Sequence, residues 1–131
     1  MVRPFAEKLR EALLQPLPGA EAQEKMMGRV KSMPQEIPAD ARPSAVLCLL
    51  FPVNDEPHIL FMKRKEDNTA HSGQVSFPGG RYEEQDANYK TTALREANEE
   101  VGILSSDVEI LGALTSLYIP VSNFNVYPFV G

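Results

Sequence analysis

The sequence predicts an α+β domain, because segments with helical periodicity are interspersed with short apolar runs typical of strands. Apolar residues recur three or four positions apart over residues 4–15 and 87–101, which indicates amphipathic helices. Other apolar runs lack that spacing and are separated by Gly, Pro and polar turn residues, as strands are. These runs cover residues 45–51, 58–63, 74–77, 108–118 and 124–130.

The composition indicates a small acidic domain. The chain has 131 residues, a net charge of −5 and one cysteine, which fits one domain with a single core. The acidic balance argues against a nucleic-acid-binding surface, and no apolar run approaches the ~20 residues of a membrane span. Cys48 lies in an apolar run and is expected in the core. Because the first residues are too charged for a signal peptide, we expect a cytoplasmic protein.

We expect residues 1–43 to form an N-terminal helical extension and linker, and residues 44–131 to form the main domain. In the extension, the amphipathic segment 4–15 lies between two prolines and predicts a short helix. A second helix is expected over residues 20–33, before three prolines that mark residues 34–43 as the linker. The apolar side of this second helix, expected to pack against the core, consists of Met26, Met27, Val30 and Met33.

The strand-like runs favour a sheet with a covered central strand. Residues 45–51 are continuously apolar, as in a strand buried on both faces. Residues 52–57 are typical of a turn, so residues 58–63 are expected to form the antiparallel hairpin partner. Residues 108–118 predict one long strand, bent near its glycine. In the last run, Pro128 favours an edge strand or a bulge.

The helix predicted over residues 87–101 carries most of the chemistry. Asp86 is its expected N-cap, and Gly102 stands where a C′ glycine would end it. At ~100° per residue, the apolar residues of this helix fall on one narrow stripe that would pack against the rest of the domain. The stripe consists of Ala93, Leu94, Ala97 and Val101.

Three carboxylates, those of Glu96, Glu99 and Glu100, fall on the arc beside this stripe. A solvated acidic face is one interpretation, because exposed Glu pairs at this spacing repel by only ~0.2–0.5 kcal/mol. Two features favour a cation site instead. The cluster lies at the helix C-terminus, where the macrodipole disfavours negative charge, and the Gly79–Gly80 turn upstream can bring backbone close to a metal or phosphate. Clustered carboxylate oxygens suit Mg²⁺ or Mn²⁺.

Residues 80–103 contain, in order, a glycine, a spacer, an acidic residue, a second spacer and REANEEVGI. This order resembles the Nudix box, the signature of hydrolases of nucleoside diphosphates linked to another moiety. The matching positions are Gly80, Arg95, Glu96, Ala97, Glu99, Glu100, Gly102 and Ile103. The acidic residue, Asp86, is usually Glu in the family, where it braces the arginine, and here eight residues instead of seven separate it from Arg95. The resemblance implies a mixed sheet between helices. Since the final strands and C-terminal helix of that fold would follow Gly131, we expect the chain to be a fragment of the domain.

A second motif, HSGQVSFPGG over residues 71–80, resembles the signature of coenzyme A diphosphatases within the Nudix group, together with residues 60–64. The spacer of eight residues is also what this subgroup shows. Thr69 departs from the subgroup, which usually has an arginine at this position. The resemblance implies cleavage of coenzyme A (CoA) or a CoA derivative to adenosine 3′,5′-bisphosphate and 4′-phosphopantetheine.

The resemblance also implies the roles of the acidic residues. Glu96, Glu99 and Glu100, with the Gly80 carbonyl, would hold one to three Mg²⁺ or Mn²⁺ ions around the diphosphate. Glu99 is the candidate to orient or deprotonate the attacking water. Arg95 would orient a neighbouring Glu through a charge-assisted hydrogen bond.

Contacts with substrate are expected from residues before the box. Arg64 and Lys65 are the nearest basic candidates for a phosphate contact, with a solvated loop as an equal alternative. His71 could donate to a phosphate or hold the loop through a backbone hydrogen bond. Gly73 and Gly79 would let the backbone approach a ligand closely.

Two alternatives to a CoA diphosphatase stay open. The same enzyme class could act on ADP-ribose, a dinucleoside polyphosphate or a nucleoside triphosphate. A non-catalytic Nudix-like domain could instead bind a nucleotide as a sensor, although such a domain would be expected to have lost carboxylates of the box. In each case the expected partner is a small-molecule nucleotide, neither nucleic acid nor membrane is expected, and a homodimer is an assembly that we consider.

Overall fold

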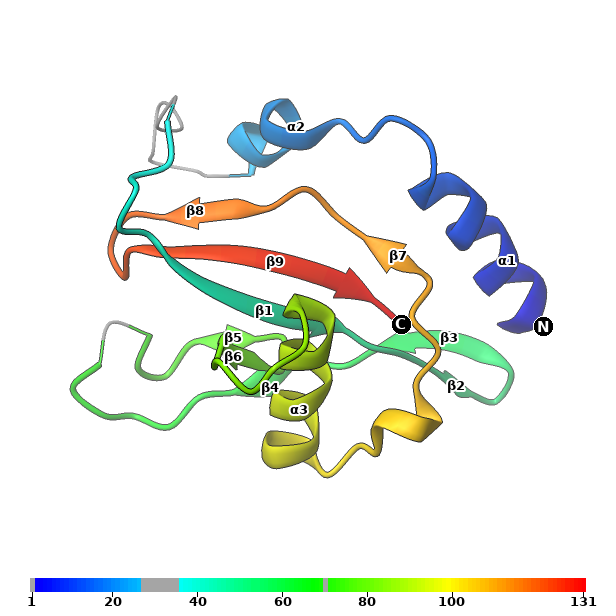
Figure 1. Ribbon diagram of the computed structural model, residues 1–131. Coiled ribbons are helices and arrows are strands. Elements are labelled where there is room, and N and C mark those ends of the chain that lie inside the picture. The colour runs from blue at the N-terminus through cyan, green and yellow to red at the C-terminus, as the bar shows by residue number, and fades with distance from the viewer. Residues whose placement is uncertain (1, 27–35, 70) are drawn as a thin grey trace.

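The computed structural model describes residues 2–26, 36–69 and 71–131 and shows a mixed sheet between helices (Figure 1). In the described part of the chain this sheet has five strands in the order β6–β1–β9–β7, with β8 also paired to β9. β1 and β9 are parallel, and the other pairs are antiparallel. The strands are β1 (Arg42–Cys48), β6 (Gly79–Arg81), β7 (Gly112–Ala113), β8 (Leu117–Ile119) and β9 (Phe124–Val130). The predicted α+β class is confirmed.

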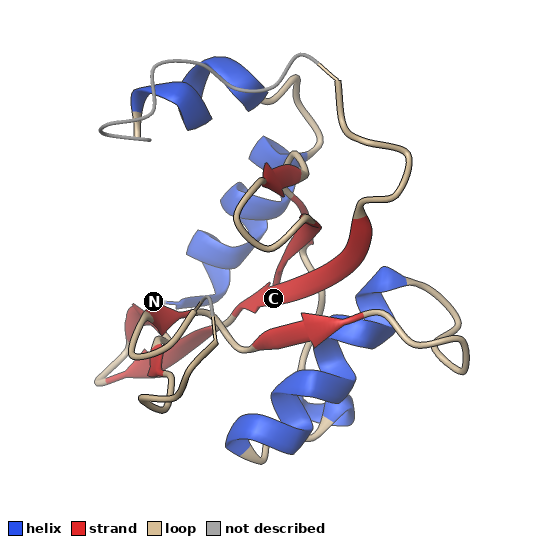
Figure 2. Ribbon diagram, turned by 90° about the vertical axis from the view of Figure 1, so that its left-hand side faces the viewer, coloured by secondary structure: helices blue, strands red, loops and turns tan. Residues whose placement is uncertain are grey.

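Successive residues of the central strand β1 point to opposite faces of the sheet and so contribute to two apolar clusters. Ala45 and Leu47 are fully buried beneath α3 (Tyr89–Val101). Cys48 points the other way and packs with residues of α1 (Val2–Leu13). Figure 2 shows the strands between these two helices. Cys48 is therefore a core residue as predicted, and burial raises the pKa of its thiol to about 11.

Both predicted N-terminal helices form, although the second is short. α1 packs against the sheet, whereas α2 (Gly19–Lys25) has its C-cap at Met26. The prediction that Met26 packs in the core is wrong, because this residue is 86% exposed. β1 begins at Arg42, inside the segment predicted as a linker. The other predicted apolar residues of the second helix fall within residues 27–35, outside the described residues; they are Met27, Val30 and Met33.

The apolar run 45–51 is divided between β1 and β2 (Leu50–Val53) instead of forming one strand. β2 pairs with β3 (Glu56–Ile59), so the predicted hairpin is confirmed. Asn54 and Asp55 form its turn with positive φ angles of 51° and 65°, as the commonest two-residue hairpin turn requires. Continuous apolar character does not reveal where one strand pairing ends and the next begins.

The predicted strand 58–63 is divided in the same way. Its first residues belong to β3, and its last residues form β4 (Met62–Lys63). β4 pairs with β5 (Val75–Ser76), which confirms a short strand within residues 74–77. These two strands bring together the ends of a loop over residues 64–74, where several predicted substrate-binding residues lie.

The prediction of one long strand over residues 108–118 is wrong, because only the short strands β7 and β8 form there. Of the edge strand or bulge predicted at Pro128, the edge strand is wrong, since β9 lies inside the sheet. The register of β9 shifts by one residue between β8 and β7, which agrees with the bulge alternative. The Pro128 carbonyl accepts a hydrogen bond from the Leu114 amide at 2.9 Å. Its missing N–H would face the same side, where the antiparallel pairing changes from β8 to β7. That interruption allows a proline in an inner strand.

α3 begins at Tyr89, later than predicted, because Asn88 is its N-cap and Asp86 is not. The Asn88 side-chain oxygen accepts a hydrogen bond from the Thr91 amide at 2.8 Å. Gly102 ends the helix as predicted, in the left-handed conformation with a φ of 74°. The Asp86 carboxylate bonds instead to side chains of the helix itself.

α2 lies over β7 and β8 beside a largely apolar cavity of about 580 Å³. The Gln23 amide nitrogen donates to the carbonyl of Thr115 at 3.1 Å, which ties the helix to the sheet. The apolar residues lining the cavity include Leu17, Met26, Phe77, Leu114, Leu117 and Pro128. Among the described helices, none has the length and apolar character needed to cross a membrane.

Candidate active site

α3 places two of its carboxylates directly beside the glycine pair of β6. Glu100 Oε1 accepts a hydrogen bond from the Gly79 amide at 3.2 Å. A Cβ built at Gly80 would lie 2.4 Å from the Glu96 Cδ atom, so the Glu96 carboxyl group fills the space that any larger residue would need. The structure therefore brings together four of the predicted site residues from two elements.

The backbone groups of the two glycines point in opposite directions. The Pro78 carbonyl accepts a hydrogen bond from β1 at 2.8 Å, and Gly80 follows two residues later, in register with Ala45. Because residues of an antiparallel pair alternate, the Gly80 carbonyl faces β1 and the Gly79 carbonyl faces outward. The bond from the Gly79 amide to Glu100 agrees with this alternation. The geometry thus favours the carbonyl of Gly79, and not the predicted carbonyl of Gly80, as the one free to bind a metal ion.

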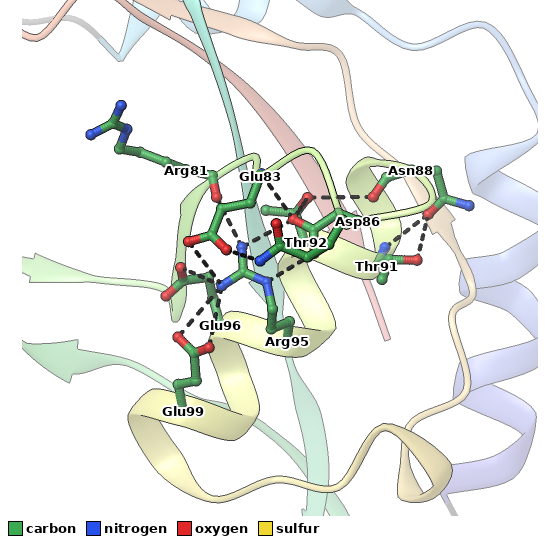
Figure 3. Close-up of polar contacts among 10 residues, drawn as sticks. Arg81, Glu83, Asp86, Asn88, Thr91, Thr92, Arg95, Glu96 and Glu99 are labelled. Atoms are coloured by element: carbon green, nitrogen blue, oxygen red, sulfur yellow. Dashed lines mark hydrogen bonds and ion pairs between the residues drawn. The ribbon is translucent and has the colours of Figure 1, made fainter.

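Arg95 and Asp86 form a buried, bidentate ion pair at the base of this cluster (Figure 3). Arg95 Nε and Nη2 donate to the two Asp86 oxygens at 2.9 and 3.0 Å, and Nη2 also donates to the Arg81 carbonyl. The Asp86 side chain is only 2% exposed. The hydrogen bonds from Arg95 hold the pKa of Asp86 well below its usual range, and those to Asp86 raise the pKa of Arg95.

The remaining nitrogen of the guanidinium, Arg95 Nη1, reaches the carboxylates of α3. It donates to Glu96 Oε1 at 3.0 Å and to Glu99 Oε1 at 3.3 Å. Glu83 Oε1 lies 3.9 Å from the same nitrogen. Asp86 thus fixes the guanidinium through Nε and Nη2, and Nη1 holds the Glu96 and Glu99 carboxylates in place. This agrees with the expectation that Arg95 orients a neighbouring Glu.

Glu96 differs from the other carboxylates of α3 in its environment. Its side chain is 18% exposed, whereas that of Glu99 is 55% exposed. Burial raises the pKa of Glu96, hydrogen bonding from Arg95 opposes that shift, and the charges of Glu99 and Glu100 add to it. Crowded carboxylates are therefore one cause of the raised pKa, and loss of water around the carboxyl group is the larger one.

The carboxylates suit a divalent cation in chemistry but are not gathered into a preformed cage. Glu96, Glu99 and Glu100 offer the hard oxygen donors that Mg²⁺ and Mn²⁺ prefer, next to the outward carbonyl of Gly79. Within the described residues, no group of three or more His, Cys, Asp or Glu side chains converges in a metal-binding arrangement. The donor set fits the cation, and the flexible Glu side chains would need to turn toward it.

Four of the predicted substrate-binding residues, Arg64, Lys65, His71 and Gly73, lie on the loop between β4 and β5, and the fifth, Gly79, lies in β6. The Arg64 amide donates to the Gln74 carbonyl at 2.8 Å, and the Gly73 amide donates to the Lys65 carbonyl at 3.0 Å. His71 Nδ1 lies 3.1 Å from Gln74 Oε1, so this ring braces the loop through a side chain. Gly73 has a φ of 70°, which explains a glycine there without a ligand.

The loop and the carboxylate cluster are separate groups in this structure. Among the described residues, no hydrogen bond or ion pair connects Arg64, Lys65 or His71 with Glu96, Glu99 or Glu100. The two groups are related through the chain, because β5 leads through Pro78 directly into β6. Phosphate contacts from Arg64 and Lys65 therefore remain predictions.

The sequence did not indicate the participation of Thr92. This residue is fully buried, and its hydroxyl donates to Asp86 Oδ2 at 2.8 Å. The Glu83 amide donates to the same oxygen at 3.1 Å. The position of Thr92 next to the apolar stripe of α3 could have indicated a buried polar contact. Helical threonines, however, often bond to a backbone carbonyl of their own helix, so the position alone did not predict a bond to Asp86.

Comparison with known proteins identifies the family. The NUDIX domain matches residues 41–128, so the chain belongs to the Nudix hydrolase family. Two relatives named "Uncharacterized Nudix hydrolase NudL" come from Yersinia enterocolitica and Pectobacterium atrosepticum. The first is 42% identical over 98 residues, which cover 75% of this chain and 49% of the relative. The second is 40% identical over 101 residues, which cover 73% and 52%. The chain thus spans about half the length of these relatives.

Solved structures show the same fold at low sequence identity. The Ap4A hydrolase of C. elegans has a TM-score of 0.56 at 16% identity and covers 69% of this chain and 66% of its own. A MutT/nudix family protein from Enterococcus faecalis has a TM-score of 0.56 at 19% identity, with coverage of 95% and 46%. The NUDIX domain of Shewanella oneidensis NrtR, complexed with ADP ribose, has a TM-score of 0.52 at 16% identity, with coverage of 84% and 67%. At these identities the likeness establishes the fold.

Alanine at Gly79 and at Gly80 should have different effects. A Cβ at Gly79 would lie 2.3 Å from the Ala45 carbonyl oxygen, in the backbone of β1. We expect Gly79→Ala to lower the free energy of unfolding by about 1–3 kcal/mol, as overpacking against rigid neighbours does. At Gly80 the three atoms nearest to the Cβ all belong to the end of the Glu96 side chain, which can move, so Gly80→Ala should be nearly as stable as the wild type and should displace that carboxylate.

Urea unfolding measures the first effect, and calorimetric titration with Mn²⁺ measures the second. Gly79→Ala should lose stability, and Gly80→Ala should lose Mn²⁺ affinity with little loss of stability. Equal destabilisation by both substitutions would contradict the arrangement of Glu96 against Gly80.

The Asp86–Arg95 pair should make stability depend on pH in the acid range. Because the folded-state pKa of Asp86 is depressed, its contribution is complete above the ordinary value of 3.8 and is lost as the pH falls below it. Asp86→Asn should lower the free energy of unfolding at pH 7 by about 3 kcal/mol, since it leaves a largely buried guanidinium without its main partner.

Urea unfolding at pH 7 and at several values between 5 and 3 measures both effects. Glu84→Asn is a control of the same charge change, because Glu84 is exposed in the loop before α3. An Asp86→Asn protein whose stability falls with acid as steeply as that of the wild type would exclude the pair as the source of the dependence.

Proposed function

We propose that the protein is a metal-dependent hydrolase that cleaves the diphosphate linkage of CoA or a CoA derivative. The observation that supports this most directly is the placement of three carboxylates on one helix: Glu96 and Glu99 bond to Arg95, and Glu96 and Glu100 lie against the Gly79–Gly80 segment. An acidic cluster that is merely solvated would not need a buried ion pair to fix its geometry. The family membership of residues 41–128 supports the same reaction class.

The residues that would hold the divalent cation are Glu96, Glu99, Glu100 and a carbonyl of the Gly79–Gly80 segment, with Gly79 favoured by the strand alternation. When bound, such a cation neutralises diphosphate oxygens and lowers the pKa of an attacking water. The chain itself supplies the negative charge that attracts the cation and the fixed backbone that limits where it can lie.

Two side chains would have roles beyond binding the cation. Glu99 is much more exposed than Glu96, at 55% against 18%, and is therefore better placed to orient a water and receive its proton. Arg95 would hold the Glu96 and Glu99 carboxylates next to each other against their mutual repulsion, because both accept hydrogen bonds from the same nitrogen, Nη1. Its bidentate bond to Asp86 prevents it from following either carboxylate into solvent.

The assignment of CoA as the substrate rests on the HSGQVSFPGG motif and the spacer of eight residues. Arg64 and Lys65 would contact the 3′-phosphate that distinguishes CoA from most nucleotides. Both lower the pKa of the neighbouring Asp67, after the larger effect of Thr69, so their positive charges act within the loop. The loop is closed by backbone hydrogen bonds, which would present the two cations at a fixed place.

A second candidate substrate is ADP-ribose. It is favoured by the complex of the NrtR NUDIX domain with ADP ribose, which has the same fold. Turnover of the full-length protein with CoA, dephospho-CoA, ADP-ribose and deoxynucleoside triphosphates, with and without Mg²⁺, distinguishes these candidates. The absence of turnover with every compound, together with tight nucleotide binding, would support the non-catalytic alternative.

Activity should require a divalent cation and the carboxylates of α3. We expect EDTA to abolish turnover and Mg²⁺ or Mn²⁺ to restore it. Loss of groups that only support metal ligands typically costs about 10- to 100-fold in activity, so Glu99→Gln and Glu100→Gln should each lower kcat by at least about that much. Thermal stability should be unchanged or slightly raised, because repulsion between neighbouring carboxylates is relieved.

Glu84→Gln is the matched control for these variants, because it removes one exposed carboxylate outside the cluster. It should leave kcat and the Mg²⁺ dependence unchanged. A Glu100→Gln enzyme with near-native kcat would rule out Glu100 as a ligand, and undiminished turnover in a thoroughly chelated sample would rule out the metal mechanism.

Recognition of the 3′-phosphate should make dephospho-CoA a poorer substrate than CoA. If Arg64 contacts that phosphate, Arg64→Ala should remove much of the preference, because a charge-assisted hydrogen bond contributes about 1.5–3 kcal/mol, or about ten- to a hundredfold in kcat/KM. Lys65→Ala is measured in parallel, and Arg3→Ala on α1 controls for the loss of one positive charge. Faster cleavage of ADP-ribose than of CoA by the wild type would refute the CoA assignment and leave the family assignment intact.

A further inference from the structure

Thr92 is a polar residue in the buried face of α3, where the hydroxyl group has a specific partner. The residue is fully buried, like Ala93 beside it. Its Oγ1 lies 2.8 Å from Asp86 Oδ2 and 3.3 Å from the Asn88 carbonyl. A hydroxyl carries one hydrogen, and the carboxylate is both nearer and charged, so the hydrogen bond goes to Asp86. This differs from the usual helical threonine, which bonds to the carbonyl one turn before it.

The bond matters because Asp86 is not part of the helix that it supports. It lies two residues before the N-cap, in the loop that carries the longer spacer of eight residues. Its Oδ2 atom accepts from Thr92, from the Glu83 amide at 3.1 Å and from Arg95 at 3.0 Å. Of these three donors, only the Thr92 hydroxyl sits on a short, buried side chain of α3 itself.

Arg95 also has partners that would draw it away from Asp86. Its Nη1 atom bonds to Glu96 and Glu99, and Glu83 lies 3.9 Å away. A guanidinium on a long side chain can follow such carboxylates when its anchor moves. The position of the anchor therefore determines where Arg95 holds Glu96 and Glu99.

We propose that Thr92 is a positioning residue: its hydroxyl fixes the Asp86 carboxylate to α3, Asp86 fixes Arg95, and Arg95 places Glu96 and Glu99. The catalytic consequence rests on the proposed hydrolase function, whereas the placement of Arg95 does not. The alternative is that Thr92 only packs in the core. In that case its methyl group would contribute to stability, and loss of its hydroxyl would not change the position of Asp86.

Two substitutions at Thr92 separate these roles. Thr92→Val replaces the hydroxyl by a methyl group of similar size, and Thr92→Ser keeps the hydroxyl but removes the methyl group from a fully buried site. We expect Thr92→Val to lower kcat about tenfold, at the lower end of the range seen for supporting partners, with KM changed less than kcat. Thr92→Ser should retain kcat within about threefold even if its melting temperature falls further.

The matched control is Thr91→Val, on the preceding position of the same helix. The Thr91 hydroxyl bonds to the Asn88 side chain at 3.0 Å, and the backbone amide of Thr91 keeps the N-cap bond when the hydroxyl is removed. Thr91→Val should therefore retain kcat. A loss equal to that of Thr92→Val would show that any threonine hydroxyl near the start of α3 matters, which would overturn the proposal.

A measurement without substrate tests the placement directly. In the folded protein the Arg95 Nε–H is hydrogen-bonded to Asp86, so its NMR signal should be protected from exchange with water. We expect Thr92→Val to accelerate that exchange by about tenfold, as loss of one hydrogen-bond equivalent would, and Thr92→Ser and Thr91→Val to leave it unchanged.

The outcomes distinguish the two proposals. An unchanged Arg95 Nε–H signal in Thr92→Val, or loss of kcat in Thr92→Ser but not in Thr92→Val, overturns the role of Thr92. If the wild-type protein hydrolyses none of the nucleotides, the proposed function fails, while a Thr92-dependent Arg95 signal still establishes the positioning role.

Discussion

The arrangement of the site depends on one buried interaction, the ion pair between Asp86 and Arg95. A carboxylate that is 2% exposed can remain charged only with good partners, and this one accepts hydrogen bonds from a guanidinium, a backbone amide and a hydroxyl. The pair joins the loop after β6 to the middle of α3. Because the guanidinium extends beyond Asp86 to Glu96 and Glu99, the same interaction that closes the loop also positions the acidic surface.

α3 is useful because its two sides meet opposite demands. The buried side carries small residues, Ala93 and Ala97, so the helix can approach β1 closely. The adjacent side carries three negative charges at the end of the helix where the macrodipole disfavours them. Close approach of the helix to the sheet brings Glu96 and Glu100 against the glycine pair, and a side chain at Gly80 would displace the Glu96 carboxylate. The short distance between α3 and β1 therefore both packs the helix against the sheet and places its carboxylates beside the glycines.

The sequence was most informative where one local property decides the outcome. Helical periodicity located α1 and α3, an obligatory positive φ located the end of α3 at Gly102, and the box motif located the carboxylates. It was less informative where pairing between distant segments decides. The strand expected over residues 108–118 does not form as one piece, because β9 pairs with β7 and β8 and not with the residues between them. Pro128 is tolerated inside the sheet because it lies beside that interruption. Neither fact is visible in the composition of a single segment.

For the site, the sequence by itself determined the residue types and their spacing on one helix, and hence the presence of an acidic face near a glycine pair. Only the tertiary structure decided which partner each side chain takes. Aspartate is a residue type typical of an N-cap, yet Asn88 caps the helix. The Asp86 carboxylate instead accepts hydrogen bonds from Arg95 and Thr92. The choice of Gly79 over Gly80 as the outward carbonyl follows from the register of β6 on β1. Such choices depend on directions and distances between separate elements, and the order of residues along one segment does not contain them.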